Sequence, residues 1–410
     1  MSEALIRHPP DRSAVRLPWT LVVLLSAISA IGPLSIDMYL PSLPSIAHDL
    51  GASAQVTQAS VTIFLAGMSF GQLFYGPASD RLGRRLPILV GFCVYVAASL
   101  ASTLTQGPLT LLAARFAQSL GACAGTVIVR AIVRDHFDHQ ESARFFSLLA
   151  LVAGATPILA PLGGALLLNL VGWRGIFGVL TAFGVMLALT AFLGLRESRS
   201  ESVAQHARSE HPLRSYLAVL RERRVVGYVL AGALNGAVLF TYLSSSPAVL
   251  IGVYGVSPAH YGVLVSANAV GLIGGSQLNR LLLRYWGADG VLSAATLGTA
   301  AATVLLSVAA LTGAAGLAGL LVPLFLAIAS VAVIQSNCIA GALAVDPLRA
   351  GSTSALLGAS SFACGALAGS LAGALFDGSA RPMALTIAAC AIGCGLAVRR
   401  LALRRESHAG

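Results

Sequence analysis

The sequence predicts an all-α integral membrane protein, with twelve transmembrane helices arranged in two pseudo-symmetric six-helix bundles. Of its 410 residues, 56% are hydrophobic and only 10% are charged. Soluble globular domains carry about 25% charged residues, so most of this surface must face lipid. Apolar runs near the roughly 20 residues that a helix needs to cross the hydrocarbon core recur along the chain. One polar segment divides these runs six and six.

The apolar runs lack the alternation of barrel strands, and we therefore expect helices. They lie at residues 17–46, 54–76, 86–106, 108–131, 143–169, 173–195, 224–251, 258–283, 288–312, 314–344, 351–376 and 382–402.

The arginines predict the orientation in the membrane. All 26 basic residues are arginine, and 23 of them fall on one side if both termini are cytoplasmic. Arg174 and Arg381 fall on the other side, and Arg115 lies within a span. Because positive residues favour the cytoplasmic side, we expect both termini and the central loop there. The arginines are spread over several loops without interleaved aromatic residues, which argues against nucleic-acid binding.

The polar segment predicts the domain organisation. Residues 1–195 form an N-terminal bundle, residues 196–223 a cytoplasmic loop, and residues 224–410 a C-terminal bundle. The end of the loop, LRSYLAVLRER, has the pattern of an amphipathic helix lying on the membrane surface. DRLGRR after span two has a counterpart in NRLLLR after span eight. Such a parallel repeat predicts a substrate site between the halves, near mid-membrane.

Asp37 stands in the apolar segment LSIDMYLPSLP, residues 34–44. An ionisable residue inside a span is by default a functional-site hypothesis. Pro33, Pro41 and Pro44 interrupt the backbone hydrogen bonds around it, which is tolerated where a helix lines a cavity. We therefore expect Asp37 to face a polar cavity and to bind and release a proton there.

Arg115, in RFAQSLGACAG, is the one arginine placed inside an apolar span. At 1.5 Å per residue, Arg115 lies about 10 Å and Asp37 about 13 Å from the same membrane face. Opposite charges at one depth would stabilise each other, so an Asp37–Arg115 pair is expected. Two alternatives stay open, namely a pair that is merely structural and an arginine that snorkels to the interface.

Two further segments carry unusual chemistry. In GPASDRLGRR, Gly76 would permit close helix approach, Gly83 a sharp reversal, and Asp80 would offset a cluster of positive charge; an ordinary positive loop is the alternative. That cluster is Arg81, Arg84 and Arg85.

In GATPILAPLGGALL, residues 154–167, Pro157 and Pro161 break the helix ladder. Gly154, Gly163 and Gly164 would allow tight packing, and generic glycine packing is the alternative.

These residues resemble signatures of the major facilitator superfamily. Its G-x-x-x-D-R-x-G-R-[RK] signature is similar to residues 76–85, and its R-x-x-Q-G-x-G signature to residues 115–121, with Ser119 for the first glycine. The span five motif is similar to residues 154–164, with Ala160 for a glycine. Together with IDMYLPSLP, RAIVRD and PILAPLGG, the chain resembles the Bcr/CflA drug-resistance branch.

The resemblance implies roles for these residues. The loop after span two would be a conformational latch whose Asp80 pairs with Arg130 or Arg134. Arg115 would organise proton transfer, and the span five motif would mark export and limit ion leakage. The branch implies antibiotic substrates such as bicyclomycin or chloramphenicol-type phenicols.

Polar and aromatic residues within spans are candidates for substrate contact, although such groups equally serve as links between helices. The candidates are Tyr39, Gln118, Asn235, Phe240, Tyr242, Asn268, Gln335 and Asn337.

Other function classes fit poorly. The chain has no lysine, so it contains no phosphate-binding G-x-x-x-x-G-K-[ST] loop. The six cysteines lie in apolar segments as small core residues, and neither a disulfide, a metal site nor a cofactor is expected. An enzyme and a channel with a visible filter are disfavoured. We expect a proton-coupled exporter of small drug-like compounds, monomeric, in the bacterial cytoplasmic membrane. An exporter of a metabolite and an uptake symporter are the alternatives.

Overall fold

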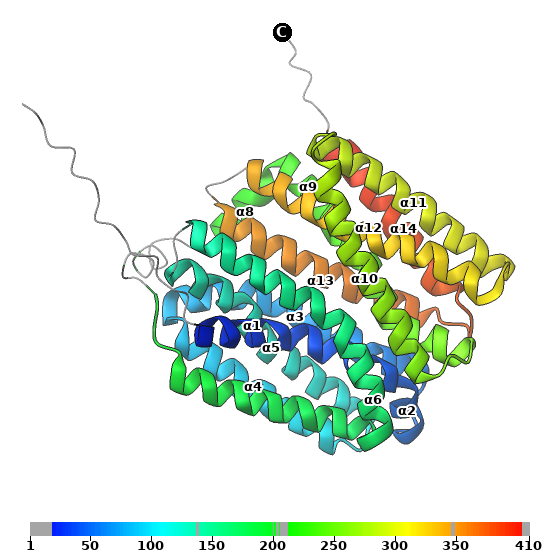
Figure 1. Ribbon diagram of the computed structural model, residues 1–410, viewed down its shortest axis with the longest axis horizontal. Helices are drawn as coiled ribbons and strands as arrows, with labels where there is room; N and C mark the ends of the chain where they lie inside the picture. Colours follow the sequence, from blue (N-terminus) through cyan, green and yellow to red (C-terminus); the bar gives the residue numbers. More distant parts are fainter. Residues whose placement is uncertain are drawn as a thin grey trace, which may run out of the picture.

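The computed structural model describes residues 19–136, 139–199, 201, 205, 212–345 and 349–403, and this part of the chain is helical without strands (Figure 1). The N-terminal half contains α1 Trp19–Asp37, η1 Leu40–Ser42, α2 Leu43–Asp49, α3 Ala54–Leu82, α4 Arg85–Leu104, α5 Pro108–His136 and α6 His139–Gly194. The helix α8 Pro212–Arg221 leads into the C-terminal half. That half contains α9 Arg223–Ser246, η2 Pro247–Val253, α10 Pro258–Leu282, α11 Ala288–Thr312, α12 Gly316–Val345, α13 Ala350–Ala374, α14 Arg381–Ala397 and η4 Val398–Ala402.

The helices provide the twelve predicted crossings. Ten helices of the described chain are long and apolar enough to span a membrane. One of them lies in α6, which contains a break at Gly172 (φ 69°, ψ 178°) and therefore crosses twice. α10 is not among the ten, yet its 25 residues reach about 37 Å, and it packs between α6 and α12. The predicted all-α membrane fold is confirmed.

The end of α1 follows from its prolines. A helical N–H at position 41 would bond the carbonyl of Asp37, but Pro41 has no N–H. α1 accordingly ends at Asp37, and a short 3₁₀ turn, η1, follows. The sequence thus places a carboxylate at the end of a helix that breaks inside the membrane.

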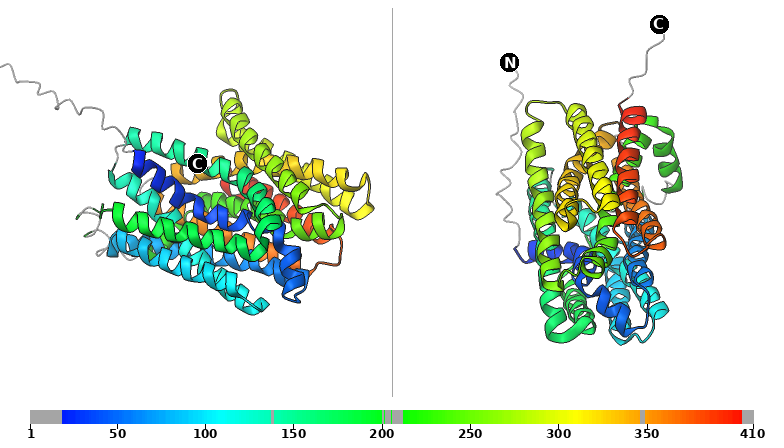
Figure 2. Two further views of the ribbon diagram at one scale, coloured as in Figure 1. Left: turned by 60° about the horizontal axis from the view of Figure 1, so that its bottom comes forward. Right: turned by 90° about the vertical axis from the view of Figure 1, so that its right-hand side faces the viewer.

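The helices form two groups. α1, α3, α4, α5 and α6 pack together, as do α9 to α14. The groups meet along two seams, α3 with α13 and α6 with α10 (Figure 1). Figure 2 shows from two further sides that the long helices run side by side.

Close approach of two helices depends on glycine at particular points. A Cβ added at Gly164 of α6 would lie 1.8 Å from the carbonyl oxygen of Met38, and one at Gly275 of α10 would lie 2.0 Å from that of Ala329. The tight packing predicted for the span five glycines applies to Gly164 only. A Cβ at Gly163 meets nothing within 4 Å, and one at Gly154 makes only ordinary contact with Ile273.

The two ends of the bundle differ in charge. We call the end with the α3–α4 turn, residues 195–199 and the start of α9 the arginine-rich end. The opposite end carries α2 and η2, which pack against each other across the two halves.

Candidate functional site: a central cavity and a charged cluster

A cavity of about 500 Å³ lies between the two halves. Helices α1, α3, α5 and α6 contribute to it from one half, and α9, α10, α12 and α13 from the other. Its described lining consists of Ser29, Gly32, Pro33, Ile36, Asp37, Met68, Gln72, Thr126, Arg130, Leu149, Pro157, Leu239, Phe240, Tyr242, Leu243, Val265, Asn268, Ala269, Leu272, Ile328 and Phe362.

Hydrogen bonds between the halves close the opposite end. Gln58 Nε2 donates to Ser245 Oγ (2.6 Å) and to the carbonyl of Gly369 (3.3 Å). On the second seam, Ser266 Oγ donates to the carbonyl of Ile158 (2.6 Å). Arg130, by contrast, lies in the last two turns of α5, toward the arginine-rich end. The cavity therefore lies on the arginine-rich side of the Gln58 contacts, and the Ser266–Ile158 bond flanks it, next to the lining residues Val265 and Pro157.

The α3–α13 seam flanks the cavity. Ser69 Oγ of α3 donates to the carbonyl of Ala359 of α13 (2.8 Å). Gln72, one turn further along α3, lines the cavity and lies against Gly358. The cavity is thus bounded on this side by a continuous contact between the halves.

Asp37 is the one carboxylate among the described residues that line the cavity. Its side chain is buried, at 5% exposure, and within the described chain it forms neither a hydrogen bond nor an ion pair. A buried carboxylate without a protein partner faces whatever occupies the cavity. This placement agrees with the expectation that Asp37 faces a central cavity.

The expected Asp37–Arg115 pair is absent from the described structure, and this expectation was wrong. Arg115 is fully buried and donates to the carbonyl of Ser35 (Nη2, 2.9 Å) and to Gln118 Oε1. Its guanidinium carbon lies 4.2 Å from the ring centre of Tyr39 and 4.3 Å from that of Phe64. These rings stabilise the cation through their π faces.

The end of α1 supplies the remaining partner for Arg115. The last four carbonyls of a helix lack internal partners and carry a partial negative charge that favours a cation. Ser35 is among the last residues of α1, so its carbonyl can serve as such a partner. Arg115 therefore fixes the backbone two residues before Asp37, while leaving the carboxylate itself unpaired.

Three of the eight candidate substrate residues line the cavity. Asn268 Nδ2 donates to the hydroxyl of Tyr242 (2.9 Å) on one wall. Phe240 stacks against Phe362, with ring centres 5.1 Å apart.

The other five are not among the described lining and link helices instead. Tyr39 bonds Ser60, Gln118 bonds Arg115 and Ser99, Asn235 bonds Gln335 and the carbonyl of Val331, and Asn337 bonds Asn279.

Sequence reasoning missed several lining residues. Met68, Gln72, Thr126 and Phe362 line the cavity, but nothing in their spacing distinguishes them from packing residues. Arg130, expected as a latch partner, also lines the cavity. Pro157 of the span five motif lies in the lining as well.

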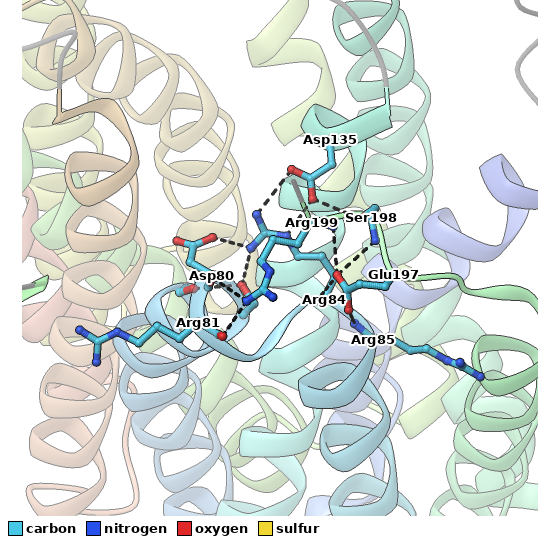
Figure 3. A network of polar contacts seen from close by, with 10 residues as sticks. Asp80, Arg81, Arg84, Arg85, Asp135, Glu197, Ser198 and Arg199 are labelled. Carbon is cyan, nitrogen blue, oxygen red and sulfur yellow. Dashed lines mark hydrogen bonds and ion pairs between the residues drawn. The ribbon is translucent and has the colours of Figure 1, made fainter. Parts of the chain in front are cut away.

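A second group of polar contacts, the charged cluster, lies at the arginine-rich end (Figure 3). Its centre is Arg84, whose side chain is 4% exposed and contacts two carboxylates. Arg84 Nη1 donates to Asp80 Oδ1 (2.5 Å), and Nε donates to Asp135 Oδ2 of α5 (2.8 Å). Burial lowers the pKa of Arg84, but the hydrogen bonds and charges of Asp135 and Asp80 raise it by more.

Among the described residues, the ion pair between the turn and α5 has the opposite polarity to the expected one. Asp80 was expected to pair with Arg130 or Arg134 of the neighbouring helix. Instead the turn supplies the cation, Arg84, and α5 supplies the anion, Asp135. The side chain of Arg134 lies outside the described residues.

Glu197 and Arg199, which sequence reasoning missed, cap the helices that flank the turn. Glu197 accepts hydrogen bonds from the backbone N–H groups of Arg84 (2.9 Å) and Arg85 (3.2 Å), at the start of α4. Arg199 Nη1 donates to the carbonyls of Asp80 (3.2 Å) and Arg81 (2.6 Å), at the end of α3. An anion at a helix start and a cation at a helix end both stabilise the helix dipole.

The position of Glu197 at the start of α4 shifts its pKa. Partial burial raises its pKa, but hydrogen bonds from backbone N–H groups, two of them at the start of α4, lower it by more. The net pKa of Glu197 lies below its ordinary value. The one available signal was an acidic residue among arginines directly after span six.

The turn itself requires glycine at one of the two predicted positions. Gly83 has φ +94°, and a Cβ there would lie 2.4 Å from Glu197 Oε2. Gly76 was expected to allow close helix approach, but a Cβ there meets nothing within 4 Å, so that expectation was wrong. In the span four segment, the serine in place of glycine is accommodated by Gly67, where a Cβ would lie 1.8 Å from Ser119 Oγ.

Comparisons with known proteins agree with this geometry. A family model described as the Major Facilitator Superfamily matches residues 25–373. The chain is 37% identical over 360 residues to an uncharacterized MFS-type transporter, YdgK, of Bacillus subtilis (strain 168), covering 86% of this chain and 88% of the relative. It is 31% identical over 371 residues to a bicyclomycin resistance protein homolog of Haemophilus influenzae, covering 90% and 93%. The crystal structure of a D-xylose-proton symporter superposes with a TM-score of 0.74 at 12% identity, covering 93% and 97%, which shows a shared fold.

Proposed function

Because this chain belongs to the Major Facilitator Superfamily and, within it, to the Bcr/CflA-type drug-resistance branch, we propose that it exports small drug-like compounds in exchange for protons. The observation that carries the proposal is Asp37, a carboxylate without a protein partner in the described chain, facing a cavity between the halves. Such a group can bind either a proton or a substrate donor.

The walls of the cavity suit compact, partly apolar substrates. About 500 Å³ lies within the usual range of small-molecule sites, which combine apolar walls with few polar groups. Phe240, Phe362 and Met68 provide apolar surface, while Tyr242 and Asn268 provide hydrogen-bonding groups. These walls and the name of the Haemophilus relative support bicyclomycin-type antibiotics as substrates, and the resemblance to the Bcr/CflA branch adds phenicols.

The proposed orientation places the arginine-rich end in the cytoplasm, in accordance with the positive-inside rule. We also propose that the chain acts as a monomer and that its membrane is the bacterial cytoplasmic membrane. With its cavity on the arginine-rich side of the Gln58 contacts, the structure is proposed to correspond to the state that takes up substrate from inside.

The proposed cycle alternates two occupants of one site. Substrate enters from the cytoplasmic side while Asp37 is ionised, and the halves then rock to open the opposite end. A proton from outside binds Asp37, removes its charge and weakens its hold on the substrate, which leaves. The return movement carries the proton inward, where it is released. Each occupant shifts the equilibrium between the two states by its difference in affinity for them.

Arg115 and the charged cluster have supporting roles in this proposal. Arg115 holds the end of α1, so that Asp37 stays at the cavity wall without being neutralised by an ion pair. The charged cluster, including Asp80, Arg84 and Asp135, holds the α3–α4 turn against α5 and acts as the latch of the N-terminal half.

Transport into and out of proteoliposomes tests the function. Wild-type protein should drive phenicol movement when a pH gradient is imposed, against the direction of proton flow. Asp37→Asn should abolish gradient-driven transport while the protein still inserts. Asp377→Asn, which alters an exposed carboxylate of the opposite end, should transport normally.

The outcome also separates the alternatives. Movement of substrate in the same direction as protons would establish an uptake symporter. Unchanged pH dependence in Asp37→Asn would reject the coupling role of this residue. A susceptibility panel in an efflux-deficient bacterium, with and without the gene, identifies the substrate class.

A further inference from the structure

The short helix α8, Pro212–Arg221, lies outside both bundles but touches both of them. It packs against α9 and α13 of the C-terminal half, beside which Figure 1 places it. Val219 is fully buried within a core cluster of that half. From α8, the hydroxyl of Tyr216 donates to the carbonyl of Leu73 of α3 (3.5 Å). α8 therefore lies across the seam between the halves.

One face of α8 is apolar and uncovered. Leu213, Leu217 and Leu220 follow the i, i+4, i+7 spacing of a single helix face, and they are 57%, 50% and 47% exposed. Three exposed leucines on one helix face would be unfavourable in water. The neighbouring surface indicates what covers them, because Phe70 and Phe74 of α3 are also exposed, at 60% and 58%, beside the Leu73 contact.

The polar face of α8 is basic. Arg214 and Arg221 are both exposed and lie on the same side of the helix, away from the buried Val219. Glu222 follows Arg221 directly, and Arg223 and Arg224 come after it. Those two arginines donate to the carbonyls of Arg400 and Ala402, at the end of η4.

Leucines on one face and arginines beside them match the pattern of a helix at the boundary between acyl chains and headgroups. The apolar face continues a surface of membrane-spanning helices, so its neighbour is lipid. The charge of the polar face is complementary to a phosphate that carries net negative charge.

We propose that α8 is a binding site for an anionic phospholipid, whose headgroup contacts Arg214 and Arg221 and whose acyl chains cover Leu213, Leu217 and Leu220. A lipid bound there holds α8 against the membrane surface. Because α8 contacts α3 through Tyr216 and the C-terminal core through Val219, the lipid stabilises the seam at the arginine-rich end.

The site also lies near the charged cluster. Partial burial raises the pKa of Tyr216, and the nearby carboxylate of Asp80 raises it further. Tyr216 is therefore within electrostatic range of the turn that Arg84 holds.

Lipid titration of the full-length chain in detergent, followed by native mass spectrometry, tests the proposal. Wild-type protein should bind phosphatidylglycerol more tightly than phosphatidylcholine. The double variant Arg214→Gln/Arg221→Gln should weaken phosphatidylglycerol binding about 25-fold, since each of the two arginines near the surface contributes about a factor of five, and should leave phosphatidylcholine binding unchanged. Both positions are exposed, so the fold should be retained.

The matched control removes two exposed arginines from another turn of the same end, Arg280→Gln/Arg284→Gln. This control should bind phosphatidylglycerol as wild type does. Equal loss in both double variants would show a general charge effect, and unchanged binding in Arg214→Gln/Arg221→Gln would overturn the site. Native mass spectrometry measures lipid binding without any transport assay, so the result does not depend on the proposed export function.

Discussion

At the arginine-rich end, each half links its second and fourth crossings, but the two halves do so with different chemistry. In the N-terminal half, the buried Arg84 links Asp80 to Asp135 of α5. In the C-terminal half, Asn337 of α12 donates to Asn279 Oδ1 of α10 (2.8 Å), an amide pair without charge.

The repeated sequence explains the difference. DRLGRR and NRLLLR place Asn279 where Asp80 stands and Leu283 where Arg84 stands. The C-terminal turn thus lacks both the acid and the cation, and α10 runs on through Leu282 where α3 stops before Gly83.

The comparison teaches that the same position in the fold can be held by an ion pair or by a neutral hydrogen bond, with different consequences for stability. Removing one partner of a buried ion pair strongly destabilises a protein, because the other charge remains buried without a partner. A neutral amide pair contributes only about 1 kcal/mol. The N-terminal junction is therefore the one that should lose more stability when a single partner is removed.

The largest expected effect comes from removing the central cation. Arg84→Gln leaves Asp80 and Asp135 facing a neutral group, and we expect the free energy of unfolding to fall by about 3 kcal/mol. Denaturation of the purified protein in detergent measures this change. Arg284→Gln, at the exposed equivalent of Arg85, should change the free energy of unfolding by less than about 0.5 kcal/mol. Similar values for both variants would remove the distinction between the two junctions.

Gly83→Ala should have the next largest effect. The alanine must adopt φ +94°, and its Cβ would meet the carboxylate of Glu197, so we expect a loss of about 2 kcal/mol. Gly76→Ala is the matched control seven residues earlier in the chain, in open space within α3. Alanine there should be neutral or stabilise by up to about 1 kcal/mol. Thermal unfolding measures the stability of both variants. A larger loss of stability in Gly76→Ala than in Gly83→Ala would contradict the prediction.

The amide junction provides a smaller and sharper test. Asn337→Leu leaves Asn279, which is buried, without its donor, and should cost about 1–2 kcal/mol. The double variant Asn279→Leu/Asn337→Leu removes both partners and should recover most of that loss. A double-mutant cycle measures the coupling. If the double variant is as unstable as the sum of the single variants, the pair is not the link that we describe.

The sequence was sufficient for features that depend on local patterns. Lengths of apolar runs predicted the twelve crossings, and Gly83 predicted the reversal, because backbone geometry there excludes other residues. Pro41 and Asp37 together indicated a helix that breaks beside a cavity.

Features that depend on rotation about helix axes could not be predicted. Depth placed Asp37 and Arg115 at one level, but depth does not say which way each side chain points, and Arg115 points to the Ser35 carbonyl instead. The same uncertainty misplaced Tyr39, which is buried behind the cavity, while Tyr242 lines it. Glu197 meets Arg84 across 113 residues of chain, a contact that only the closed fold reveals.

The smallest expected effect concerns the charge of Glu197, for which the C-terminal turn has no described equivalent. Glu197→Gln keeps an acceptor at the start of α4 but removes the charge, and because the residue is largely exposed we expect a loss of only about 0.5 kcal/mol at pH 7. The folded pKa of Glu197 lies below its ordinary value of 4.5. Its stabilising contribution is therefore complete above about pH 4.5 and is lost as the pH falls through the lower, folded pKa. Unfolding measured from pH 7 to pH 3 should show wild type and Glu197→Gln converging in acid, whereas a gap that stays constant would assign the effect to the shape of the side chain instead of its charge.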